Sequence, residues 1–66
     1  MKLRFLNIYK AQIKSHLLNI QKQLSQKNVS FDFKLIDENP LDEYFDVEVF
    51  DKKIYKFLQK NLSKFN

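Results

Sequence analysis

The chain has 66 residues, with twelve Lys and Arg against eight Asp and Glu, one His, one Pro and neither Gly nor Cys. Without Cys there is no disulfide framework and no Cys-based zinc site, and without Gly there is no glycine-rich phosphate loop. The length allows one domain, residues 1–66. A hydrophobic content of 44% is too high for a disordered chain.

The clearest periodic segment runs from Ile8 to Lys27 and predicts an amphipathic helix. Its apolar side chains recur at helical spacing within one narrow arc: Tyr9, Ile13, Leu17, Ile20 and Leu24. We expect Asn7 to be the N-cap, and Asn28 to take the left-handed conformation that ends the helix.

Residues 2–6 admit two interpretations. Apolar Leu3 and Phe5 alternate with basic residues, which favours a short strand. Leu6, however, also continues the apolar stripe of the helix that follows. The alternative is therefore one long N-terminal helix and an αββα chain; we favour the strand.

Two later segments, Val29 to Ile36 and Glu43 to Phe50, alternate between apolar and polar residues. They predict two strands of an antiparallel hairpin. The connection between them, residues 37–42, contains the one proline of the chain and is expected to be a loop.

The register of this hairpin follows from its apolar face and its charges. Both strands must turn their apolar residues to the same side, which leaves only registers that pair odd-numbered residues. We expect Phe33 to lie opposite Val47 and Lys34 opposite Asp46, because opposite charges across strands are favourable. In this register Asp32 lies opposite Glu48. We expect that cost to be milder than in the other possible register, which sets Asp32 opposite Asp46.

Asp51 is expected to cap a closing helix from about Lys52 to Phe65. Its apolar arc holds Ile54, Tyr55, Leu58, Leu62 and Phe65. The predicted fold is a small two-layer α+β (βαββα) structure, with two helices on one face of a short antiparallel sheet. In element order it resembles a ferredoxin-like layout that lacks the final strand, and because such folds host many functions the resemblance implies none in particular.

Charges of opposite sign are separated along the chain. Residues 1–31 carry six basic side chains and no acid, residues 32–51 carry all eight acids and one Lys, and residues 52–66 carry five Lys and no acid. The sequence therefore predicts basic helices and an acidic hairpin.

Two patches are candidate partner-binding sites. The first combines aromatic and acidic side chains on the sheet face turned away from the helices: Tyr44, Asp46, Glu48 and Phe50. The second is a stripe of lysines four residues apart on the last helix: Lys52, Lys56, Lys60 and Lys64. Together they predict a small non-enzymatic protein-interaction or regulatory module that binds another protein or a second copy of itself.

The alternative function is nucleic-acid binding through the lysine-rich helix faces. A sequence pI near 9.4 supplies the sequence-independent attraction to phosphates. The first helix would add Lys10, Lys14 and Lys22 to the lysines of the last helix.

Enzyme chemistry has little basis in this sequence. His16 has no carboxylate on its helix to orient it as a base. The acidic loop lacks the glycine and the ligand spacing of a calcium loop. We expect no metal, no cofactor and no small-molecule substrate. No segment approaches the ~20 apolar residues of a membrane span or the apolar stretch of a signal peptide, which predicts a cytoplasmic protein.

Overall fold

The computed structural model describes residues 1–37 and 41–65 of the chain. Its elements follow in the order β1 (Lys2–Leu6), η1 (Asn7–Tyr9), α1 (Lys10–Gln26), β2 (Phe33–Ile36), β3 (Tyr44–Val49), α2 (Lys52–Asn61) and η2 (Ser63–Phe65), where η marks a short 3-10 helix. The predicted α+β fold is confirmed, with strands and helices in the predicted sequence. Residues 38–40 of the predicted loop lie outside the described residues.

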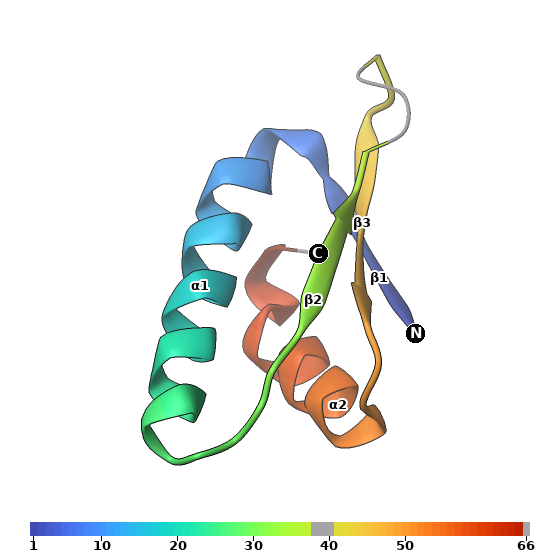
Figure 1. Cartoon of the computed structure of the whole chain (residues 1–66). Helices are drawn as coiled ribbons and strands as arrows, with labels where there is room; N and C mark the ends of the chain where they lie inside the picture. Colours follow the sequence, from blue (N-terminus) through green and yellow to red (C-terminus); the bar gives the residue numbers. More distant parts are fainter. Residues whose placement is uncertain (38–40, 66) are drawn as a thin grey trace.

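The three strands form one antiparallel sheet with β3 in the centre, in the order β1-β3-β2. Both helices lie on the same side of this sheet (Figure 1). Successive residues of a strand point to opposite faces, and in β3 the odd-numbered Phe45, Val47 and Val49 are buried. The sheet therefore has a covered inner face and an outer face that neither of the described helices covers.

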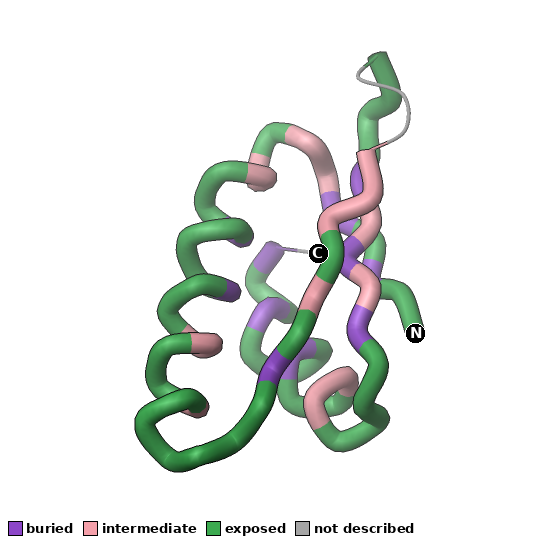
Figure 2. Tube along the Cα trace, viewed as in Figure 1, coloured by how far each residue is buried: buried purple, intermediate pink, exposed green. Residues whose placement is uncertain are grey.

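The core lies between this inner face and the helices, where the buried residues gather (Figure 2). Ile13 and Leu17 contribute the centre of the predicted arc of α1, and its other members are partly buried. From the end of the chain, Leu58, Leu62 and Phe65 are buried. Helical spacing therefore gave the correct core face of both helices.

The residues that were expected to end α1 and to begin α2 do so. Asn28 has φ of 60°, the left-handed conformation. There, its N–H donates to the carbonyl of Ser25 (3.1 Å), and the N–H of Val29 donates to that of Leu24 (2.9 Å). At α2, the Asp51 carboxylate accepts from the backbone N–H groups of the residues two and three positions on, at 2.8 and 3.3 Å.

Replacing Asp51 with alanine should therefore destabilise the protein by about 1 kcal/mol, the usual cost of losing such a cap. The reason is that two N–H groups of the first turn of α2 lose their acceptor. Urea unfolding of the variant measures the change, and Asp51→Asn, which preserves a capping oxygen, is the matched control. Equal loss in both variants would show that the carboxylate acts through its charge rather than as a cap.

The start of α1 differs from the prediction. Residues 2–6 form a strand, as favoured, and the alternative of one long helix is wrong. Asn7, however, does not cap α1: its side-chain amide donates to the carbonyl of Asp42 (2.8 Å), and its backbone N–H donates to that of Glu43 (2.8 Å). Because Asn7 directly follows β1, it continues the ladder to the segment before β3, and α1 begins three residues later.

The predicted register of the hairpin is wrong by two residues. Phe33 lies opposite Val49 rather than Val47, and Lys34 lies opposite Glu48 rather than Asp46. The physical reason is β1, which pairs with the other side of β3 and sets its own Arg4 opposite Asp46. In the observed register Lys34 lies opposite the second acid of β3, Glu48. Because the displacement is by two residues, the same side chains still face the core.

Two elements are shorter than predicted. β2 begins only at Phe33, because β3 ends at Val49 directly opposite and no described strand pairs with residues 29–32. The last helix, α2, ends at Asn61, and the separate 3-10 turn η2 follows it. This early end matters for the predicted lysine stripe.

Candidate partner-binding surfaces

Each acid that β3 places on the outer sheet face lies opposite a basic residue of a neighbouring strand. The Arg4 guanidinium Nε donates to the Asp46 carboxylate (3.2 Å). This hydrogen bond, with the attraction of the same carboxylate, raises the pKa of Arg4 above its ordinary value. Glu48 lies between Lys2 and Lys34 in the register. The outer face is thus balanced in charge, and it is not the acidic surface that the hairpin alone predicted.

The two aromatic residues of the first predicted patch lie in different surroundings. Tyr44 is half exposed, and the Arg4 guanidinium lies over its ring at 5.9 Å from the centroid. Phe50 is beyond the end of β3, 69% exposed, and borders the start of α2. Phe50 thus lies outside the strand that holds the other three residues of that patch, and it lines a groove with lysines of α2.

The second predicted patch lies on the exposed face of α2. At 100° per residue, the side chains of Lys52, Lys56, Lys60 and Lys53 occupy the arc opposite the buried Leu58. All four lysines are exposed. The ion pairs within residues 1–37 and 41–65 are Arg4–Asp46 and Lys10–Asp37, so none of these four lysines forms an ion pair with a described carboxylate. We call these four residues the lysine face.

An open groove connects Phe50 to the lysine face. It encloses about 610 Å³ and is lined by Phe50, Asp51, Lys52, Lys53 and Lys56. The carboxylate of Asp51 is engaged as the helix cap. Phe57, 46% exposed, lies on the flank of the same face, beside Lys53 and Lys60 in the helical projection. Sequence periodicity placed the lysines but could not place Phe50 next to them.

Lys64 does not continue the lysine face. Because α2 ends at Asn61, Lys64 lies in η2, with its ammonium 5.2 Å from the centroid of the Phe65 ring. It lines a separate open groove beside α1, with Phe65 and residues such as Gln12 and His16. The His16 ring packs edge-on against Phe65 (5.6 Å between centroids), and none of the described residues that line this groove is acidic.

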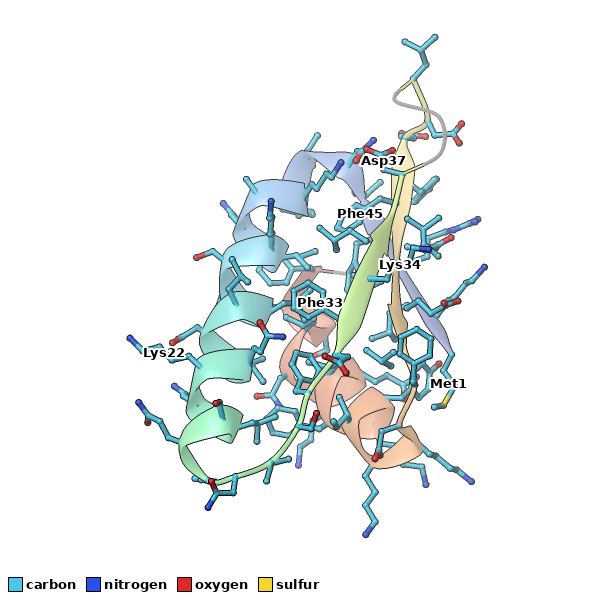
Figure 3. The ribbon with its side chains drawn as sticks, viewed as in Figure 1. Met1, Lys22, Phe33, Lys34, Asp37 and Phe45 are labelled. Carbon is cyan, nitrogen blue, oxygen red and sulfur yellow. The ribbon has the colours of Figure 1, made fainter. Side chains whose placement is uncertain are left out.

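The lysines of α1 that the nucleic-acid alternative uses are not equivalent. Lys10 pairs with Asp37 (2.5 Å) next to the end of β2. Lys14 is exposed, and Lys22 projects away from the sheet (Figure 3). Eight residues separate these two along α1, so they form no compact patch like that of α2.

In residues 1–37 and 41–65 no three His, Asp or Glu side chains are grouped so as to hold a metal ion. Over that same part of the chain, no helix has both the length and the apolar character needed to cross a bilayer.

Comparison with known proteins finds no match for the chain, whether among family models, curated proteins or solved structures.

Proposed function

We propose that this protein is a small non-enzymatic interaction module that binds an acidic surface of another protein through the lysine face of α2, with Phe50 and Phe57 as apolar contacts at its borders. The observation that carries the proposal is the exposed row of lysines without a described acidic partner, beside a 69% exposed phenylalanine. Charge complementarity with aromatic anchors is a common basis of protein recognition.

The position of these lysines disfavours a purely structural role. Lys52 and Lys53 stand in the first turn of α2, where the helix dipole disfavours positive charge, and this turn contains no acid. Lys52, Lys56 and Lys60 also repel each other at a spacing of four residues. Each such effect costs a few tenths of a kcal/mol in an isolated helix. An acidic partner would relieve both.

Nucleic-acid binding is the second candidate, and one observation favours it. Phe50 is exposed in the same groove as Lys52, Lys53 and Lys56. An aromatic ring bordered by lysines can stack on a base while the ammonium groups contact phosphates. Arg, which reads bases in the major groove best, occurs once in the chain. This candidate would therefore bind single strands with little sequence preference.

The test measures the fluorescence anisotropy of two labelled probes. One is an acidic peptide that alternates Glu with Leu, and the other is a single-stranded oligodeoxynucleotide. Binding is measured at about 50 and about 200 mM salt, because attraction between charges weakens as the salt concentration rises. The variant replaces Lys52, Lys53 and Lys56 with Gln, which has a similar helix propensity. The matched control replaces Lys14, Lys22 and Lys27 with Gln, so that both proteins have the same net charge.

We expect the wild type to bind the peptide more tightly than the oligonucleotide, and the α2 variant to lose about tenfold in affinity, as for three lost charge contacts at a surface. The α1 control should lose less than about threefold. Tighter binding of the oligonucleotide would replace the first candidate with the second. Equal losses in the two variants, or no binding of either probe at low salt, would refute a site on α2.

A further inference from the structure

The hydrogen bonds of β1 show which of its backbone groups are unused. Met1 and Val49 exchange two bonds, from the amino group of Met1 to the Val49 carbonyl (3.0 Å) and from the Val49 N–H to the Met1 carbonyl (2.9 Å). Six residues later, the Asn7 N–H donates to the Glu43 carbonyl (2.8 Å). In an antiparallel pair such residues alternate with residues whose N–H and C=O point away. The N–H groups of Lys2, Arg4 and Leu6 therefore point out of the sheet.

This outward side of β1 is a free edge of the sheet. The strand order is β1-β3-β2, and no described strand lies beyond β1. The other edge is tied to α1: Gln21 donates to the Phe31 carbonyl (2.8 Å) just before β2, and Lys10 pairs with Asp37 just after it. No such contact from a helix is made to the backbone of residues 2–5 within the described chain. Beside β1 there is instead an open groove lined by Arg4, Phe5, Leu6, Tyr44 and Phe65.

Edge strands are usually protected against pairing by charged side chains, a proline, a bulge or a covering helix or loop. β1 pairs with β3 continuously over all five of its residues and contains neither a bulge nor a proline. Its central charge, on Arg4, is compensated by Asp46 of the neighbouring strand. The strand therefore has a straight edge whose middle is electrically neutral.

We propose that the edge of β1 pairs with β1 of a second copy of the chain, antiparallel about a two-fold axis at Arg4. In this register Arg4 lies opposite Arg4 of the second copy, and Lys2 lies opposite Leu6. The outward N–H of Arg4 then donates to the outward carbonyl of its counterpart, and the N–H of Leu6 donates to the carbonyl of Lys2. The two sheets become one continuous six-stranded sheet with all helices on one face.

Charges and side chains favour this register over its neighbours. Across the axis, the side chains on the outer face follow in the order Asp46 and Arg4 of one copy, then Arg4 and Asp46 of the other. Each guanidinium therefore remains paired with the Asp46 carboxylate of its own copy. On the inner face Leu3 lies next to Phe5 of the second copy, which extends the core. A shift that sets Lys2 opposite Arg4 would oppose like charges of which only Arg4 has an ion pair with its neighbouring acid, which is less favourable. A shift the other way would move Lys2 opposite the turn η1, where no strand continues.

The test is sedimentation equilibrium of the wild type over a range of concentrations, with Arg4→Pro and Arg4→Ala as variants. The Arg4 N–H points away from β3, so proline removes the outward donor without removing a bond to β3. Alanine retains the N–H and removes only the side chain. We expect the wild type and Arg4→Ala to reach the mass of a dimer, and Arg4→Pro to remain a monomer with the same circular dichroism spectrum.

Amide exchange of the wild type provides a readout that does not depend on a variant. The Arg4 N–H should exchange slowly at concentrations where the dimer forms and quickly where it dissociates, whereas the Leu3 N–H, bonded to β3, should stay protected throughout. A wild type that is monomeric at every concentration would overturn the proposal, as would a dimer that persists in Arg4→Pro. Protection of the Arg4 N–H in a monomer would also overturn it, since another part of the chain would then cover the edge.

Discussion

Replacing Phe45 with alanine should leave most of the chain unfolded at 25 °C. Phe45 is 2% exposed in the central strand, and its ring lies 5.9 Å from that of Phe5, centroid to centroid. Removing a buried phenylalanine side chain costs about 3–5 kcal/mol. A core of this size supplies roughly 3–5 kcal/mol of net stability, so the loss is about as large as the free energy of unfolding of the wild type. Far-UV circular dichroism and urea unfolding measure the folded fraction.

Phe50→Ala is the matched control, because it removes the same side chain from a position that is 69% exposed. Its free energy of unfolding should stay within about 0.5 kcal/mol of the wild type, as for most surface substitutions. Because both variants lose the same side chain, the difference in their stability reports the effect of burial alone. Similar urea midpoints for both variants would mean that the apolar face of β3 is not the one that packs against the helices.

The type and place of each element were predictable because each has a local cause. Apolar residues recur about every 3.6 residues in α1 and every two residues in β3. Each period defines the apolar face of its own element without reference to the rest of the chain. The left-handed Asn28 and the capping carboxylate of Asp51 act on backbone groups only a few residues away. Residues 2–6 were ambiguous because five residues hold too few repeats to distinguish the two periods.

The errors at Asn7 and in the hairpin register arose where a distant segment decides the local structure. Asn7 has the side chain of a cap, but the Glu43 and Asp42 carbonyls, more than thirty residues away, accept its hydrogen bonds. The hairpin register was derived from two strands alone, whereas β1 competes for the charges of β3. Because Arg4 lies opposite Asp46, the acid of β3 that remains for Lys34 is Glu48.

The candidate site was predictable only in part for the same reason. Lysine spacing gave the exposed face of α2, which is local. The acidic sheet face was overestimated, since alternation along β3 does not reveal that Arg4 and Lys2 lie beside its acids. Phe50 was assigned to the sheet by parity, but β3 ends one residue earlier and the chain turns toward α2 there.

Replacing Glu48 with lysine should destabilise the protein by about 1–2 kcal/mol. Glu48 is half-buried in the central strand, with Lys2 opposite on one side and Lys34 on the other. The substitution turns two favourable cross-strand pairs into two unfavourable ones, each worth about 0.2–1 kcal/mol. Glu48→Gln, which removes the attraction without adding repulsion, should cost about half as much. Urea unfolding measures both, and because the penalty is electrostatic it should shrink near 1 M salt.

Exchanging the charges of Lys34 and Glu48 tests the register itself. In Lys34→Glu with Glu48→Lys, the new lysine has a glutamate on the side of β2 and repels only Lys2. The double variant should therefore recover about half of the stability that Glu48→Lys loses, because directly opposed side chains couple and distant ones add independently. Had the register set Lys34 opposite Asp46, the new glutamate would meet a like charge there, and the double variant would be less stable than Glu48→Lys alone.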